Sequence, residues 1–229
     1  MYKRQVLKEQ LAKKSNNVPL EKIDVIPNGF DDKEFIIPSN PPEDKFLMTF
    51  TGALANDENK MDDLGEALAV IVKKYPEIKF TVRFVGIIDD SIHELFQRNG
   101  IEEILETIPY VPHKEAIEYM KRSTILFYII RRAPNNEGIV SGKVFDYLGA
   151  LKPILSIGPE NGDAQRILKQ CKAGEVIDYE AKEKIVSYLE RLLKKWKLNP
   201  NIDLVEGDHL YFSRKNLSGK LADIMTSIK

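Results

Sequence analysis

The sequence has a single cysteine and no excess of charge of either sign. Cys171 stands alone among 229 residues, so an internal disulfide is excluded, and this usage indicates a reducing compartment such as the cytoplasm. The 34 basic residues are balanced by 35 acidic ones, and the net charge of -1 argues against a dedicated binder of duplex nucleic acid. The three histidines have no cysteine or histidine neighbours at ligand spacing, so we expect no metal site.

Long apolar runs are also missing. No stretch approaches the roughly 20 apolar residues that a membrane-spanning helix requires. The first residues, MYKRQVLKEQLAKK, are too charged for a secretory signal and instead predict a short amphipathic helix. We expect residues 1–22 to form this helix and a linker, residues 23–205 to form an α/β domain, and residues 206–229 to form a final amphipathic helix.

What the chain does contain is a regular alternation of apolar runs and amphipathic stretches. The apolar runs predict strands at 46–52, 80–86, 106–111, 124–130, 153–157 and 174–177. Helical spacing of apolar residues predicts helices at 61–75, 91–99, 114–122, 141–151, 162–171, 181–196 and 212–228. Ser91 is the expected N-cap of its helix. This alternation indicates a Rossmann-like, doubly wound parallel sheet of about six strands with helices on both faces.

The carboxyl ends of the strands are the edge where a ligand is expected. Doubly wound sheets bind ligands there, at the point where the strand order reverses. Four loops start at this edge, after Gly52, Gly86, Ile130 and Ile157. A glycine at a strand end also lets a ligand approach the backbone closely.

The segment 135–153, NNEGIVSGKVFDYLGALKP, carries the strongest chemical signal. A glycine-containing loop follows a buried strand and opens a helix at Ser141, whose free N–H groups favour an anion. Lys143 adds positive charge in the first turn, and Asp146 one turn later can accept both hydroxyls of a ribose. Together these features predict a nucleoside diphosphate site. The competing interpretation is that Asp146 is an ordinary surface residue of a helix.

The same segment resembles the family-4 glycosyltransferases of GT-B fold, especially bacterial ones that make surface polysaccharides. The resemblance rests on SGKVFDYLGALKPILSIGPENGDAQRIL, VIPNGFD, FTGAL, FVG and YFSRKNLSGKLADIM, which follow the order seen in the family. It implies that the chain is the C-terminal half of a GT-B fold. Residues 23–205 would then bind a nucleotide sugar, and residues 206–229 would be the helix that crosses over to the N-terminal domain.

The resemblance further implies retaining, metal-independent transfer from a UDP- or GDP-sugar, of the hexosyltransferase type, without any cofactor. The acceptor, a glycan or a lipid-linked sugar, would be bound by an N-terminal domain. The full-length protein would be cytoplasmic and could associate peripherally with a membrane. This half alone would bind the donor and transfer little sugar.

Catalytic roles fall on three residues by this resemblance. Lys60 matches a lysine that contacts the diphosphate in the family, and Lys143, from its place in the first turn of the helix, adds positive charge there. Glu137 is the candidate replacement for an acid that the family carries at the position of Gly138.

Donor binding falls on a wider set. Asp146 matches the acid that holds the ribose in the family. Ala53 stands where the family has an arginine, which leaves Arg131 and Arg132 to supply positive charge. The other expected contacts are at the strand ends and the start of the helix: Gly52, Gly86, Tyr110, Gly138, Val140, Ser141 and Gly142.

Two further interpretations remain open. Ala53 and Gly138 remove expected polar contacts, which favours a non-catalytic nucleotide-binding module. A nucleotide-sugar epimerase of GT-B fold would share the same architecture. Because the last helix of a GT-B protein crosses over to pack on the N-terminal domain, its apolar face should lack part of its partner surface here, and the helix should be mobile or self-associating. The residues of this face are Leu217, Leu221, Ile224, Met225 and Ile228.

Overall fold

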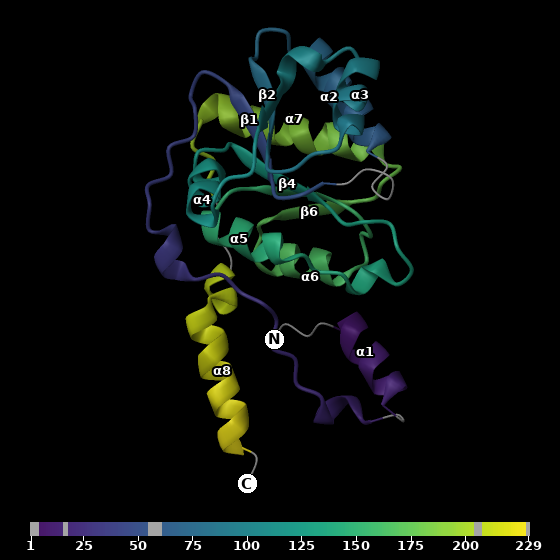
Figure 1. The fold of residues 1–229 in the computed structure, drawn as a ribbon, viewed down its shortest axis with the longest axis vertical. Coiled ribbons are helices and arrows are strands. Elements are labelled where there is room, and N and C mark those ends of the chain that lie inside the picture. The colour runs from purple at the N-terminus through teal and green to yellow at the C-terminus, as the bar shows by residue number, and fades with distance from the viewer. Residues whose placement is uncertain (1–4, 16–17, 55–60, 204–207, 228–229) are drawn as a thin grey trace.

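The computed structural model describes residues 5–15, 18–54, 61–203 and 208–227, and these form an α/β domain around one parallel sheet (Figure 1). The strands are β1 (Phe46–Thr51), β2 (Phe80–Val85), β3 (Leu105–Ile108), β4 (Ile125–Ile129), β5 (Ile154–Ile157) and β6 (Gly174–Ile177). They lie in the order β3-β2-β1-β4-β5-β6 and are parallel throughout. The order reverses between β1 and β4, which is the switch point of a doubly wound sheet.

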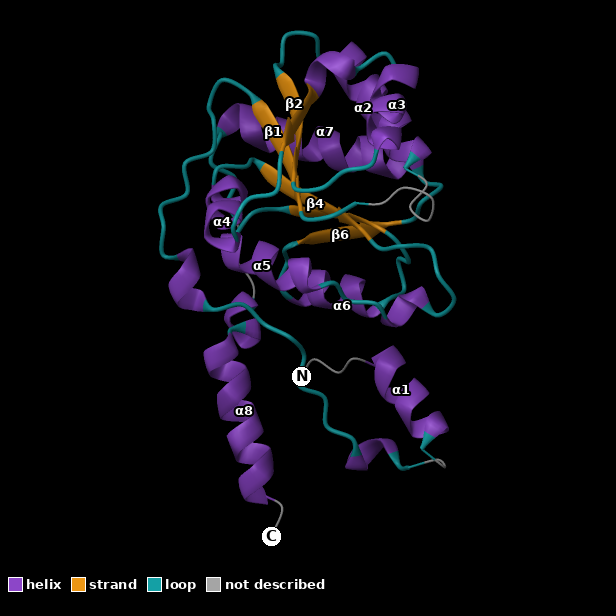
Figure 2. Ribbon diagram, in the orientation of Figure 1, coloured by secondary structure: helices purple, strands orange, loops and turns teal. Residues whose placement is uncertain are grey.

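Helices cover both faces of the sheet (Figure 2). One face carries α2 (Asp62–Lys74), α3 (Asp90–Arg98) and α7 (Lys182–Leu198), and the other carries α4 (His113–Lys121), α5 (Gly142–Ala150) and α6 (Asp163–Gln170). Two helices project beyond this body, α1 (Gln5–Lys14) and α8 (Arg214–Ser227). The 3-10 turns are η1 (Leu20–Lys22), η2 (Asp32–Phe35), η3 (Glu102–Ile104), η4 (Asn136–Gly138) and η5 (His209–Phe212). None of the described helices is both long and apolar enough to cross a membrane.

The core lies between the sheet and its two helical layers. Every residue of β1 is buried, because this strand lies in the middle of the sheet with helices on both sides. Phe50, Phe84 and Phe127, from three neighbouring strands, pack with ring centroids 5.4–5.8 Å apart. Complete burial of such a ring contributes roughly 1.5–3 kcal/mol, so these strand residues hold the centre of the sheet together.

The predicted alternation of strands and helices is confirmed, and two details differ. Strand β3 ends at Ile108, short of the predicted end at 111, because Pro109 has no N–H to continue the ladder. Ser91 is not the N-cap of α3. That position belongs to Asp89, whose carboxylate accepts the Ser91 N–H at 3.0 Å, so the helix begins one residue earlier.

The outer strand β6 has side-chain caps on its free edge. The Val176 N–H donates to Oε1 of Gln165 at 2.7 Å, and the Asp178 N–H, just beyond the strand, donates to Oε1 of Glu160 at 3.2 Å. An uncapped edge offers open N–H groups to another strand. These two contacts satisfy part of that edge within the domain.

Helix α8 is anchored at its first turns and is exposed further along. The Phe30 N–H donates to the Phe212 carbonyl at 3.1 Å, and the Arg214 N–H donates to the Phe30 carbonyl at 2.8 Å. Leu217 is buried, contrary to the expectation for the whole apolar face, because it packs against Gly29. The expected exposure is confirmed for two residues of the face, Leu221 at 46% and Met225 at 66%; Ile224 is half-buried, and Ile228 lies outside the described residues.

Candidate functional site

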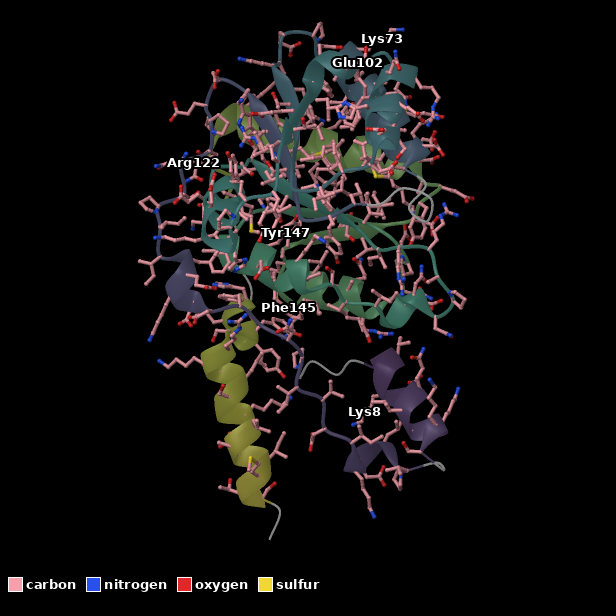
Figure 3. The ribbon with its side chains drawn as sticks, viewed as in Figure 1. Lys8, Lys73, Glu102, Arg122, Phe145 and Tyr147 are labelled. Carbon is pink, nitrogen blue, oxygen red and sulfur yellow. The ribbon has the colours of Figure 1, made fainter. Side chains whose placement is uncertain are left out.

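Strands β1 and β4 separate towards their carboxyl ends, and the hydroxyl of Tyr147 joins them there. The paired residues of these strands end at Thr49 and Leu126. Beyond them, the Thr51 N–H donates to the Tyr147 hydroxyl at 3.0 Å, and that hydroxyl donates to the Phe127 carbonyl at 3.2 Å. Tyr147 is fully buried and projects from α5 (Figure 3). One phenol therefore fixes α5 to both strands at the switch point.

Lys143, in the first turn of α5, extends its side chain over the carboxyl end of β1. Ser141 is the N-cap, and its hydroxyl accepts the Lys143 N–H at 3.3 Å. The Lys143 side chain then passes over Gly52, where an added Cβ would lie 2.6 Å from Lys143 Cε. Its ammonium stands 5.2 Å from the centre of the Phe50 ring. Burial lowers the pKa of Lys143, and the charge of Asp146 partly opposes this effect.

The glycines that follow β1 and β2 are required by the backbone. Gly52 has φ of +108° and Gly86 has φ of +132°, a region that side chains disfavour. A Cβ on Gly86 would lie 2.3 Å from the Gly52 carbonyl oxygen. The two glycines therefore let the Lys143 side chain and the Gly52 carbonyl lie directly against the main chain at this part of the carboxyl edge.

Asp146 lies one turn into α5 and is half-buried. Burial raises the pKa of its carboxyl group above the usual value, while His113, Arg214 and Lys143 act to lower it and Glu34 acts to raise it. No described residue forms an ion pair or hydrogen bond with this carboxylate. Asp146 is therefore influenced by charges of both signs, and its carboxylate oxygens have no hydrogen-bond donor among the described residues.

Turn η4 carries Glu137 and Gly138 and leads into α5. Both residues are half-buried, as is Val140. The turn packs on α1, since a Cβ on Gly138 would lie 3.4 Å from Val6 Cγ1, and it also packs near α6, where the Glu137 carbonyl would lie 2.8 Å from a Cβ on Gly162. The turn thus follows the carboxyl end of β4 and places Glu137 at the same edge of the sheet as the start of α5.

The two arginines after β4 differ in exposure. Arg131 is exposed. Arg132 donates to Glu180 at 3.1 Å, and its guanidinium stacks over the Tyr179 ring at 4.3 Å. Tyr179 in turn donates to the Ile130 carbonyl at 2.6 Å. Arg132 therefore binds the turn after β6, away from the residues at the start of α5.

Three other predicted positions differ in what the structure provides. Ala53 is exposed beside Gly52 and offers no charge. Tyr110 follows β3 and is 75% exposed, in the loop that leads to α4. Lys60 lies outside the described residues.

Sequence reasoning missed the residues that surround the predicted ones. Tyr147 adjoins Asp146 in the sequence, but its role depends on two strands that a helical pattern does not identify. His113 and Arg214 belong to α4 and α8, and they act electrostatically on Asp146 only because the fold brings these helices near it. Asn28 of the VIPNGFD motif lies by the start of α5, where a Cβ on Gly142 would be 3.7 Å from its Nδ2. Of these four, Asn28, Tyr147 and Arg214 had a sequence signal, because they belong to matched strings, and His113 had none.

Within the described ranges, no three histidine, cysteine or acidic side chains come together in an arrangement that could hold a metal ion. Lys143 and Asp146 supply one cation and one acceptor about one helical turn apart, near the carboxyl end of β1. This arrangement can bind a ligand that carries a phosphate next to neighbouring hydroxyl groups.

No known protein-family profile matches the chain, and no curated protein matches it in sequence. Solved structures do match. The lipopolysaccharide outer core galactosyltransferase WaaB superposes with a TM-score of 0.69 at 17% identity, covering 96% of this chain and 59% of that protein. The C-terminal domain of a group 1 glycosyltransferase from Francisella tularensis gives 0.55 at 17% identity, covering 76% and 92%. The chain has the fold of the C-terminal half of a GT-B glycosyltransferase.

A third structural match was solved with a ligand. The HepE protein of Anabaena, solved in complex with UDP and glucose, has a TM-score of 0.65 at 16% identity, covering 96% of this chain and 61% of that one. The chain therefore spans about three-fifths of the length of WaaB and of HepE.

Proposed function

We propose that this chain is the nucleotide-sugar-binding domain of a glycosyltransferase, with a UDP- or GDP-sugar as its donor. The observation that carries the proposal is the arrangement at the start of α5, where Lys143 and Asp146 lie on successive turns beside Gly52. The fold supports it, because solved proteins with this fold include a galactosyltransferase and a protein in complex with UDP and glucose.

In this proposal the diphosphate lies over Gly52, between the first N–H groups of α5 and the Lys143 ammonium. Free N–H groups at a helix start favour an anion by about 0.3–1 kcal/mol, and by up to about 2 kcal/mol when partly buried. During transfer the bond from the sugar to the diphosphate breaks, and negative charge grows on the departing phosphate. Lys143 and the helix start would stabilise that charge without a metal. Retention of the anomeric configuration is what the family resemblance implies.

The ribose would lie on Asp146, which can accept both of its hydroxyls. The base would then extend away from the diphosphate towards the loop that joins β3 to α4. That direction follows from His113, which begins α4 and acts electrostatically on Asp146. The exposed ring of Tyr110 in this loop can stack on a base, a contact worth about 1–3 kcal/mol where it has been measured. The transferred sugar would point towards Glu137.

Calorimetric titration of the chain with UDP, GDP and their sugar conjugates tests this site. We expect one saturable site, and we expect Asp146→Ala to weaken nucleotide binding by at least about tenfold, since two charge-assisted hydrogen bonds are lost. Lys143→Gln should weaken the binding of nucleoside diphosphates more than the binding of nucleosides. The matched controls are Asp223→Ala, on exposed α8, and Lys73→Gln, on α2 at the far end of the domain (Figure 3).

Two results would count against the proposal. One is the absence of saturable binding to every nucleotide tested. The other is equal binding by Asp146→Ala and Asp223→Ala. If the site is correct, the domain alone should cleave little UDP or GDP from a nucleotide sugar. Transfer to a glycan or a lipid-linked acceptor should require the remaining part of a two-domain protein.

A further inference from the structure

A concave surface lies at the opposite end of the sheet from Lys143 and Asp146. It is a groove of about 770 Å³ at the amino end of the edge strand β6, between the last turns of α6 and α7 and the segment 199–203. Its volume is within the range of small-molecule sites, roughly 300–1,000 Å³. The groove shares no residue with the site at the start of α5.

Four cations line this groove against two carboxylates. The cations are Lys169, Lys172, Arg191 and Lys195, and the carboxylates are Glu175 and Asp203. Both carboxylates are already engaged within the protein. Arg191 donates to Glu175 at 2.6 Å, and the buried Lys152 is bound to Asp203.

Two of the lysines therefore remain without an anionic partner. Lys169, near the end of α6, and Lys195, on α7, form no ion pair with any described residue. They face one concave surface from helices on opposite faces of the sheet. A cleft lined by charge of one sign focuses its field and attracts a ligand of the opposite sign.

The neutral side chains of the groove add donors. The side-chain oxygen of Gln165 accepts the Val176 N–H at 2.7 Å, and that of Asn199 accepts the Asn201 N–H at 3.0 Å. Because both side-chain oxygens already accept a hydrogen bond, Gln165 and Asn199 have their amide NH2 groups left to donate to a ligand. Lysine ammonium and amide NH2 groups together suit an acceptor-rich anion and offer little to a cation.

The geometry points to a second ligand site in this groove, for a small soluble molecule that carries phosphate. Phosphate presents the several acceptor oxygens that these donors require, and a concave site between two helices encloses a small molecule better than it meets a flat bilayer. This inference does not rest on the proposed glycosyltransferase function, since the two sites share no residue.

Calorimetry with inorganic pyrophosphate tests the groove. The titrations use the Lys143→Gln chain, so that binding at the start of α5 is suppressed. We expect one saturable site there, weakened by at least about tenfold when Lys169→Gln and Lys195→Gln are added. The control pair Lys73→Gln and Lys194→Gln removes the same charge from positions outside the groove, and binding should stay within about twofold.

Three results would overturn the inference. The first is that the Lys143→Gln chain shows no saturable binding of millimolar pyrophosphate, although its circular dichroism and melting temperature equal those of the unsubstituted chain. The second is equal weakening by both double substitutions, which would mean that net charge alone matters. The third is binding to vesicles of anionic phospholipid without binding to pyrophosphate, which would identify a membrane surface in place of a soluble ligand.

Discussion

The hydroxyl of Tyr147 offers a direct test of how the switch point is held. It accepts from the Thr51 N–H and donates to the Phe127 carbonyl, so Tyr147→Phe removes one oxygen and leaves two buried main-chain groups without this partner. An unpaired buried polar group costs about 1–3 kcal/mol. We expect the free energy of unfolding to fall by about 2–4 kcal/mol, since partial closure of the strands recovers some of the loss.

Tyr128→Phe is the matched control. Tyr128 is as buried as Tyr147, its ring centroid is 6.2 Å away, and the two rings meet edge to face. Its hydroxyl faces Ser156 without reaching hydrogen-bond geometry. Removing it should therefore change stability by less than about 0.5 kcal/mol or raise it slightly.

Urea unfolding followed by circular dichroism and by the fluorescence of Trp196 gives both values. Coincident transitions would establish two-state behaviour, and an unchanged slope would show that the unfolded state is not the cause. The melting temperature of Tyr147→Phe should fall by roughly 5–15 °C for a domain of this size. If the two substitutions cost the same, or if Tyr147→Phe costs less than about 0.5 kcal/mol, the hydroxyl does not join the strands.

Three further predictions concern other parts of the domain. Gly86→Ala should lower stability by at least about 2 kcal/mol, because its Cβ would lie 2.3 Å from a backbone oxygen, whereas Gly100→Ala, with open space, should cost about 1–2 kcal/mol; thermal unfolding compares them. Asp203→Asn should lower the free energy of unfolding, measured by urea titration, by about 3–5 kcal/mol, because it leaves Lys152 buried without its counter-ion. A variant as stable as the unsubstituted chain would refute this ion pair. Asp146 has a raised pKa, so the native state keeps a proton that the unfolded state has lost; stability should fall as pH rises from about 3.8 to the raised value, and Asp146→Asn should lack this component in unfolding curves taken across that window.

The sequence predicted the architecture well, because patterns of burial are local. The apolar run at 124–130 and the amphipathic stretch at 181–196 each identify their element and the face it buries. Errors arose where neighbours compete for one role. Asp89 and Ser91 can both cap a helix, and only the backbone path before α3 decides between them.

The candidate site was predictable only in part. Ser141, Lys143 and Asp146 lie on one helix, so their spacing fixes their order along it. The environment of Asp146 comes from α4 and α8, whose approach depends on the packing of the whole domain. For Arg132 the sequence position was misleading. Its place after a buried strand predicted a role in binding, but its side chain contacts Tyr179 and Glu180, which the sequence did not show to be near it.

The side-chain caps on β6 affect how copies of this domain can meet. With the Val176 and Asp178 N–H groups already bonded to Gln165 and Glu160, a neighbouring molecule gains little by extending the sheet. Crowded solutions should instead associate through exposed helical surface such as the outer half of α8. Concentrated or precipitated material is then expected to retain the native amide I infrared band, without the low-frequency component of newly formed intermolecular strands.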